Sequence, residues 1–192
     1  MEKTIRERLE ESINVKKLIL KDSHLLSLIE EIADSIKESL LKGGKIIFAG
    51  NGGSFADSIH LAAEFVSRFA FDRKPLSALA LGGNSSIVTS VGNDYQFENI
   101  FSRELDALAR KGDVFIGIST SGNSKSIIRV VQKALNKGLK VYCFTGKKGG
   151  NVAKICKCLR VPSDITARIQ EAHITIGHII CEIVESEVFN KK

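Results

Sequence analysis

The densest group of residues that could do chemistry is the stretch at residues 119–124, with the sequence Ser-Thr-Ser-Gly-Asn-Ser. It follows an apolar run and precedes a helical pattern, so its hydroxyl and backbone N–H groups gather at the positive end of a helix. Such a helix end binds phosphate without a dedicated lysine. The alternative is an ordinary serine cap, but one hydroxyl is enough for that purpose. We therefore predict a phosphate site formed by Ser119, Thr120, Ser121 and Ser124.

A glycine-rich loop at residues 50–54 precedes another predicted helix, which carries His60 and Glu64 four residues apart. These side chains are about 40° apart around a helix axis, so they can share one target. The alternative is an exposed pair that adds only about a few tenths of a kcal/mol to stability. Gln170 and His178 lie eight residues apart in the last predicted helix, about 80° around its axis. This geometry allows them to face the first pair across a cleft.

Two further groups leave alternatives open. His173 lies about 140° around the last helix from His178, and we interpret it as structural or as part of an interface. Asn93 and Asp94 follow the second strand region and Gly92. They either bind hydroxyl groups of a ligand or form a turn.

From residue 45 onward, short apolar runs alternate with helical segments and glycine-rich turns. Such runs are typical of strands covered on both faces, and their alternation with helices predicts a parallel sheet with right-handed crossovers. We expect a three-layer α/β/α sandwich with strands at 45–49, 76–81, 114–118, 140–145 and 158–161 and helices near 54–70, 96–110, 124–137 and 165–188. Ligands of such sheets bind at the carboxyl ends of the strands, where both polar loops lie.

Two amphipathic helices are predicted ahead of the sheet. One follows residues 2–20 and the other leads to Gly43 and Gly44, which end it. A length of 192 residues with 43% hydrophobic composition suits one domain at residues 1–192. The apolar stripes of the first two helices must be buried against something, and a partner chain is a natural candidate. We therefore expect residues 1–42 to be a helical oligomerisation segment.

The composition argues against several functional classes. The net charge of +6 is dispersed, with no aromatic interleaving, so we expect no nucleic-acid partner. No uncharged stretch reaches membrane-spanning length and the N-terminus is charged, so we expect a cytoplasmic protein with no membrane partner. The cysteines lack the spacing of a disulfide framework, zinc knuckle or redox pair, and we interpret them as reduced and packed like small apolar residues. They are Cys143, Cys156, Cys158 and Cys181.

Several stretches together resemble the sugar isomerase (SIS) family, and within it the phosphoheptose isomerases. The serine loop is the strongest sign of an SIS domain. The combination of His60, Glu64, Gln170 and His178 narrows the resemblance to this branch. The matching stretches, in the family's order, are residues 49–54, His60 with Glu64, residues 90–94, 117–124, 145–147 and 168–171. The resemblance implies the flavodoxin-like SIS fold, and the N-terminal helices look like the elements that form the family's homotetramers.

The resemblance also implies an activity and a site. The reaction would convert sedoheptulose 7-phosphate to D-glycero-D-manno-heptose 7-phosphate, the first step of bacterial heptose synthesis for lipopolysaccharide or other surface glycans. One zinc ion per subunit would be bound by His60, Glu64, Gln170 and His178, and Glu64 and His178 would be the acid/base residues. The substrate would contact Asn51, Gly52, Gly53, Glu64, Asn93, Asp94, Ser119, Thr120, Ser121, Ser124 and Gln170. Phe55 and Ala167 depart from the family pattern, which often has a polar residue and an Asp at these positions.

An aldose–ketose exchange moves a proton between adjacent carbons through an enediol and another proton between the two oxygens. We expect Glu64 to act on the carbons and His178 on the oxygens, because a carboxylate and an imidazole suit these tasks near neutral pH. A carboxylate bound to zinc is a poorer base, so either the metal shifts during turnover or the base lies elsewhere. The rival is a non-catalytic SIS protein, either an adaptor of the replication initiator or a sugar-phosphate sensor. Such a protein has no need of Glu64 or of Gln170 with His178.

Overall fold

The computed structural model describes residues 1–189. Two helices come first, α1 (Glu2–Lys21) and α2 (Ser23–Leu41). The strands are β1 (Ile46–Gly50), β2 (Ala78–Ala80), β3 (Val114–Ile118), β4 (Lys140–Gly146) and β5 (Lys157–Val161). The remaining helices are α3 (Gly53–Val66), α4 (Ser85–Tyr95), η1 (Phe97–Asn99), α5 (Ile100–Leu108), α6 (Lys125–Asn136), η2 (Val152–Lys154) and α7 (Thr166–Val188).

The five strands form one parallel sheet in the order β2-β1-β3-β4-β5. Every residue of β1 and β3 is buried, as expected for strands covered on both faces. The order is that of flavodoxin-like folds, in which β2 is added on one side of β1 and the strands from β3 onward are added on the other side. The predicted five-stranded α/β/α sandwich is therefore confirmed.

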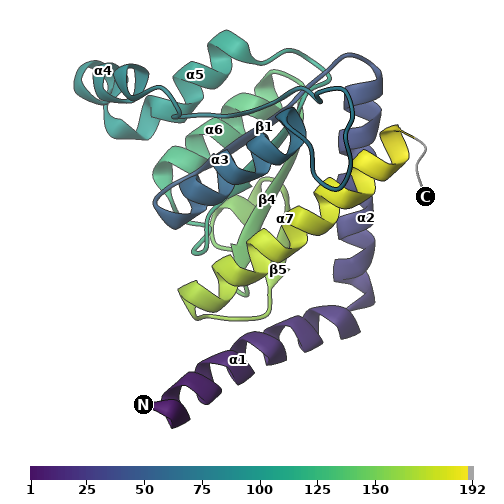
Figure 1. Cartoon of the computed structure of the whole chain (residues 1–192). Coiled ribbons are helices and arrows are strands. Elements are labelled where there is room, and N and C mark those ends of the chain that lie inside the picture. The colour runs from purple at the N-terminus through teal and green to yellow at the C-terminus, as the bar shows by residue number, and fades with distance from the viewer. Residues whose placement is uncertain (190–192) are drawn as a thin grey trace.

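Helices cover the sheet on both faces (Figure 1). Phe48 and Phe65 belong to the core on the side of α2, α3 and α7, where their rings stack with centroids 6.2 Å apart. Ile47 and Phe115 point to the opposite core, on the side of α5 and α6. Neighbouring residues of one strand thus face different cores, because side chains alternate along a strand.

The segment between β2 and β3 differs most from the prediction. A single helix near 96–110 was expected, but the structure has α4, η1 and α5 in succession. The Asn84 side chain caps α4 by accepting from the Ser86 N–H (3.0 Å), and Gln96, with φ of 77°, ends it. Of the two alternatives for Asn93 and Asp94, the turn is not formed, because this local cap makes their segment helical. β2 is also shorter than predicted, and α3 ends at Val66 rather than near residue 70.

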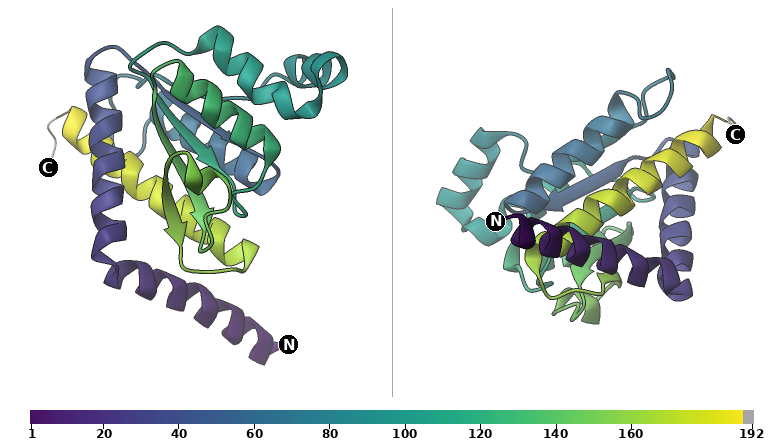
Figure 2. Two further views of the ribbon diagram at one scale, coloured as in Figure 1. Left: turned by 180° about the vertical axis from the view of Figure 1, so that it is seen from behind. Right: turned by 60° about the horizontal axis from the view of Figure 1, so that its bottom comes forward.

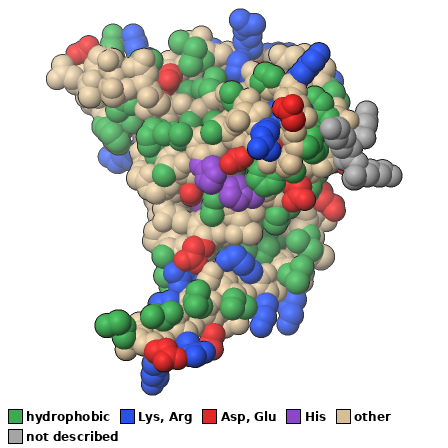
Figure 3. Space-filling view, in the orientation of Figure 1, with side chains coloured by type: hydrophobic (Ala, Val, Ile, Leu, Met, Phe, Trp, Pro, Cys, Tyr) green, Lys and Arg blue, Asp and Glu red, His purple; other side chains and the backbone are tan. Residues whose placement is uncertain are grey.

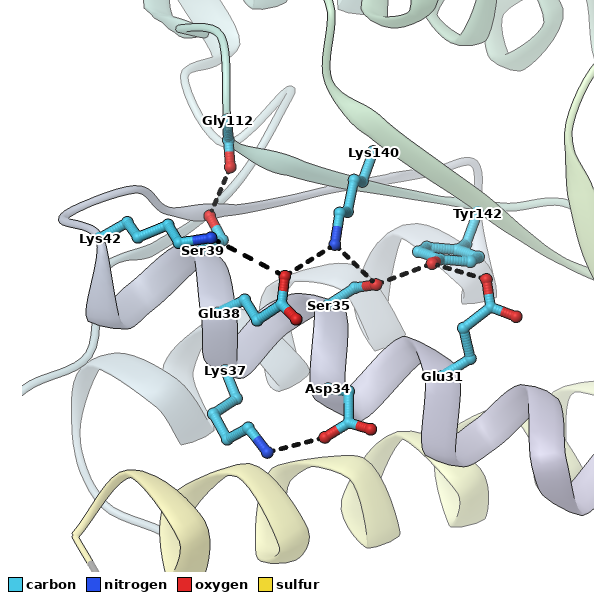
Figure 4. A network of polar contacts seen from close by, with 10 residues as sticks. All are labelled: Glu31, Asp34, Ser35, Lys37, Glu38, Ser39, Lys42, Gly112, Lys140 and Tyr142. Carbon is cyan, nitrogen blue, oxygen red and sulfur yellow. Dashed lines mark hydrogen bonds and ion pairs between the residues drawn. The ribbon is translucent and has the colours of Figure 1, made fainter.

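The N-terminal helices differ in how they meet the body. α2 lies along the sheet, whereas α1 projects below it (Figures 1 and 2). Polar contacts fix α2 to the sheet: Ser35 Oγ lies 2.8 Å from Tyr142 Oη, and the Ser39 hydroxyl donates to Gly112 O at 2.7 Å (Figure 4). None of the helices within residues 1–189 contains an apolar stretch of membrane-spanning length.

Candidate active site

The serine loop connects β3 to α6, and its shape is held by backbone contacts. Ser124 is at the N-cap of α6, yet its side chain makes no capping hydrogen bond. The Gly146 N–H donates to Thr120 O at 2.9 Å. Gly122 has φ of 65°, and a Cβ there would collide with the Gly149 carbonyl. The loop is thus a fixed helix start whose Ser124 hydroxyl is not consumed by capping, which suits the predicted phosphate site.

A cavity of about 270 Å³ lies beside this loop. Thr120 and Ser121 line it from the serine loop, and Lys147 and Lys148 line it from the segment after β4. Both lysines are exposed, and their positive charges add to that of the helix end, whereas Asp164 contributes one negative charge to the same lining. The positive charges of the cavity thus outnumber the negative one, which favours an anion.

Asn51 joins the glycine loop to the serine loop. Its Nδ2 donates to Ser124 Oγ at 2.9 Å and to Ser126 Oγ at 3.0 Å. Gly52, with φ of 57°, is the N-cap of α3. Because β1 and β3 send α3 and α6 to opposite faces, the two loops meet at the switch point of the sheet, which is where α/β folds bind ligands.

His60, Glu64 and His178 converge where α3 lies beside α7. One nitrogen or oxygen atom from each lies within 4.8 Å of the other two. His60 Nε2 is 3.0 Å from Glu64 Oε1, and the rings of His60 and His178 meet edge to face with centroids 4.9 Å apart. Figure 3 shows histidine side chains gathered in the middle of this face, with acidic side chains at their edge. Of the four side chains predicted to share one target, the structure brings His60, Glu64 and His178 together.

The chemistry of these three groups fits a divalent metal ion. Two imidazoles and a carboxylate form a common zinc ligand set, and neighbouring ligands of a tetrahedral zinc lie about 3.3 Å apart. Small side-chain movements would bring the three groups to that spacing. His178 Nε2 is moreover buried without a hydrogen-bond partner among the described residues. A buried imidazole nitrogen without a partner is costly, so a ligand at this point would satisfy it.

Close contact between α3 and α7 places the three groups. A Cβ on Gly177 would lie 2.6 Å from Leu61 Cδ2, so glycine is what lets these helices approach. Leu61 follows His60 and Gly177 precedes His178, and the approach therefore brings the two histidines together.

Gln170, the fourth predicted metal ligand, contacts a different point of α3. A Cβ on Gly53 would lie 2.6 Å from Gln170 Nε2, so the amide sits against the start of the helix. Gln170 is eight residues before His178, or about 12 Å along α7. The structure thus places Gln170 by the glycine loop, and its role as a metal ligand stays a prediction.

Asn93 and Asp94 lie on the exposed last turn of α4, where Asn93 Nδ2 donates to Asp94 Oδ1 at 2.9 Å. In Figure 1, α4 stands at the far end of the molecule from α7. This chain does not bring the two side chains to His178, and their contact with a substrate stays a prediction.

Asp57 lies close to His60 and His178, and the sequence reasoning missed it. It is half-buried on α3, one turn before His60, and its Oδ2 has no hydrogen-bond partner among the described residues. Burial raises the pKa of this carboxyl, while the nearby charges of His60 and His178 act to lower it. The spacing of Asp57, His60 and Glu64, three and then four residues, puts them on one helical face and could have revealed it.

A buried ion pair between Glu185 and Arg73 lies close to the site. Glu185 on α7 accepts from the Phe69 N–H (2.8 Å), the Ala70 N–H (2.7 Å) and Arg73 Nε (2.8 Å). Arg73 also donates to the carbonyl of Glu64 at 2.9 Å. The pair therefore joins α7 to the end of the helix that carries Glu64.

His173 has a structural role. Of the two sequence interpretations, structural or part of an interface, the structure agrees with the first. It is fully buried, and its Nε2 lies 3.2 Å from the Thr145 carbonyl oxygen. Burial lowers the pKa of His173 to about 4, so the ring is neutral near pH 7 and donates its Nε2 proton to that carbonyl.

Comparison with known proteins places this site in a family. A model of the SIS domain matches residues 14–146. The chain belongs to the SIS domain family. It is 52% identical to a phosphoheptose isomerase of Aneurinibacillus thermoaerophilus, over 98% of this chain and 96% of that protein. A phosphoheptose isomerase of Clostridium acetobutylicum is 48% identical, over 100% of this chain and 98% of that protein.

Solved structures give the same assignment of this SIS domain. A phosphoheptose isomerase from Neisseria gonorrhoeae matches with a TM-score of 0.90 and 39% identity, over 96% of this chain and 98% of that chain. One from Francisella tularensis matches with a TM-score of 0.91 and 34% identity, over 96% and 97%. The predicted resemblance to the phosphoheptose isomerases is confirmed, and with it the prediction of an isomerase.

Phe55 and Ala167 are the two positions at which this SIS domain departs from the family pattern. Phe55 lines an apolar cavity of about 180 Å³ with Phe97 and Phe101, on the side of α5. It is therefore accommodated by apolar neighbours. Ala167 is exposed at the start of α7.

Proposed function

We propose that this SIS domain is an aldose–ketose isomerase that converts sedoheptulose 7-phosphate to D-glycero-D-manno-heptose 7-phosphate. The observation that carries the proposal is the convergence of His60, Glu64 and His178 within 4.8 Å of one another. An SIS domain that only held a sugar phosphate would need the serine loop but not this group. The similarity to phosphoheptose isomerases supports the same reaction class.

The proposed division of labour follows from the residue types. The serine loop and the start of α6 hold the phosphate, and Asn51, Gly52, Gly53 and Gln170 line the path from there toward the converging groups. Glu64 takes a proton from carbon 1 of the ketose and returns it to carbon 2, and His178 moves a proton between the two oxygens. A carboxylate and an imidazole 4.8 Å apart or less can serve adjacent carbon and oxygen atoms of one substrate.

We propose that one zinc ion per subunit binds to His60, Glu64 and His178, with Gln170 as a fourth ligand and with open positions for substrate oxygens. When bound there, zinc would polarise the carbonyl and stabilise the negative charge that develops on its oxygen. Glu64 is then both a ligand and the proposed base. Asp57, which carries a second carboxylate one turn from His60, is in position to assist the ligands.

The same proposal covers domain organisation and assembly. We propose that residues 1–192 form one domain and that four copies assemble through residues 1–42. Ile5, Leu9 and Ile13 of α1 are at least half exposed (55%, 60% and 50%), so a partner chain would bury them. We place the reaction at the entry to bacterial surface-glycan synthesis in the cytoplasm. We propose neither a nucleic-acid nor a membrane partner.

The test is incubation of the purified chain with sedoheptulose 7-phosphate, with and without a chelator, followed by detection of the aldose phosphate. We expect product that is lost on chelation and restored by zinc. No product with metal supplied, although sedoheptulose 7-phosphate still binds, would reject the isomerase in favour of the adaptor or sensor.

Two variants separate the roles of the acid/base groups. Glu64→Gln keeps the size and one ligand oxygen but removes the base, so we expect zinc to be retained and turnover to fall by about a hundredfold or more. Near-normal turnover with normal zinc would reject Glu64 as the base. His178→Ala should lower both turnover and zinc content, and normal activity would exclude it from both roles.

A further inference from the structure

Three thiols meet near the edge of the sheet, away from the proposed active site. Cys143 of β4 and Cys158 of β5 are partners in the parallel register, so their side chains stand on the same face. Cys156, just before β5, brings its Sγ to 4.0 Å from Cys158 Sγ. The spacing Cys-Lys-Cys does not predict a redox pair, and only the fold adds the third thiol.

The three thiols differ in their access to solvent. Cys143 is fully buried, whereas Cys156 and Cys158 are half-buried and line a cavity of about 690 Å³ between β5 and α2. Lys157 and Arg160 line the same cavity together with Asp22 and Glu31, and Lys157 Nζ pairs with Glu31 Oε1 at 2.6 Å. Because Cys156 and Cys158 are half-buried, a small polar molecule can reach them, whereas the fully buried Cys143 is closed to it.

The surroundings also favour one sulfur as the thiolate. Hydrogen bonding with the thiols of Cys143 and Cys156 lowers the pKa of Cys158, and the charge of Arg160 lowers it further. Burial, by contrast, raises the pKa of Cys181, which lies in the other core. Thiolate character and access to solvent are the two conditions that make a cysteine reactive.

We propose that Cys158 is a modification site for hydroperoxides and that Cys156 is its resolving thiol. The Cys158 thiolate attacks one oxygen of hydrogen peroxide, the O–O bond breaks, and a proton from solvent lets the leaving hydroxide depart as water. The Cys156 sulfur then attacks the sulfenic acid of Cys158, forming an S–S bond and releasing a second water. Two thiols are oxidised and one peroxide is reduced to two waters.

Cys156 is better placed than Cys143 to resolve the sulfenic acid. Cys156 lies in irregular backbone between η2 and β5, so its side chain can turn toward Cys158 at small cost. Cys143 is in a strand paired on both sides, and a Cβ on the neighbouring Gly117 would already lie 3.1 Å from its Sγ. Closing 4.0 Å to a disulfide therefore requires less rearrangement at Cys156.

The experiment treats the reduced full-length chain with one equivalent of hydrogen peroxide and maps its tryptic peptides. Trypsin cuts after Lys154, Lys157 and Arg160, which separates residues 155–157 from 158–160. We expect loss of two hydrogen atoms from the intact chain, and these two peptides joined until a reductant is added. A link between Cys158 and the peptide 141–147, which holds Cys143, would overturn the choice of resolving thiol.

Variants and labelling rates give independent outcomes. In Cys156→Ser the sulfenic acid on Cys158 should persist and react with dimedone, whereas Cys158→Ser should consume no peroxide. Cys181→Ser, the matched control for a buried thiol, should behave as the wild type. In the native wild type, iodoacetamide should alkylate Cys158 at least about tenfold faster than Cys143 or Cys181. Equal rates, or peroxide consumption by Cys158→Ser, would overturn the proposal.

Discussion

Glu185→Gln tests the buried ion pair that joins α7 to the end of α3. The side chains of Glu185 and Arg73 are only 1% and 2% exposed. Three donors face the carboxylate, namely the N–H groups of Phe69 and Ala70 and Arg73 Nε. Glutamine fills nearly the same volume, so the change removes a charge without leaving a cavity.

The expected loss follows from this count of donors. A glutamine presents one oxygen and one NH₂ group, so at least one of the three donors faces another donor. A buried group that loses its partner costs about 1–3 kcal/mol. The charge of Arg73 is also left without its counter-charge, and breaking a buried pair costs about 3–5 kcal/mol in total. We therefore expect the free energy of unfolding to fall by about 3–5 kcal/mol.

The pH dependence gives a second signature. Burial alone would raise the pKa of Glu185, but the N–H groups of Ala70 and Phe69 and the charge of Arg73 outweigh it, so the pKa is lowered in the folded chain. A lowered pKa means that the stabilisation is fully present above the unfolded pKa, about 4.5. It is lost as the pH falls through the lower folded pKa. The difference between wild type and variant should therefore be constant above about pH 5.5 and shrink in acid.

The assay is urea unfolding at fixed protein and metal concentration, because binding and assembly both shift apparent stability. Glu187→Gln is the matched control: it lies on the same helix, two residues further on, and its pair with Lys37 is half exposed. That variant should lose less than about 1 kcal/mol. A loss below about 1 kcal/mol for Glu185→Gln, or an equal loss in the control, would refute the reasoning.

Three further predictions concern other parts of the molecule. Gly53→Ala places a methyl group against the Gln170 amide. Steady-state kinetics should show turnover about tenfold lower, while urea unfolding should show that the free energy of unfolding changes by less than about 1 kcal/mol. Unchanged turnover would show that the contact between Gly53 and Gln170 does not matter for catalysis. Asp57→Asn should weaken zinc binding by about tenfold in a calorimetric titration, and unaltered affinity would place Asp57 outside the metal's surroundings. Leu9→Glu charges the exposed stripe of α1; light scattering should show smaller assemblies with the helix content retained, and an unchanged mass would exclude this stripe from the interface.

Much of the fold could be predicted because its signals are local. The apolar runs of β1 and β3 and the helical stripe of α2 appear in the sequence as they do in the structure. The predicted element boundaries were wrong where side-chain hydrogen bonds set the ends of a helix. The side chain of Asn84 caps the start of α4, and no hydrophobic periodicity in the sequence indicates this helix. The C-terminal end of α3 differs from the prediction for a similar reason, because Arg73 donates to the carbonyls of Glu64 and Phe65 in the last turn of this helix.

The sequence by itself determined the residue types at the site and their helical spacing. It placed a hydroxyl-rich loop at a helix start and His60 four residues before Glu64, because backbone propensity and helical period act over a few residues. Only the tertiary structure decided which of these residues meet. The close approach at Gly177 brings His178 to His60, and the strand order brings Asn51 to Ser124. Contacts between residues far apart in the sequence depend on packing, which no local pattern records.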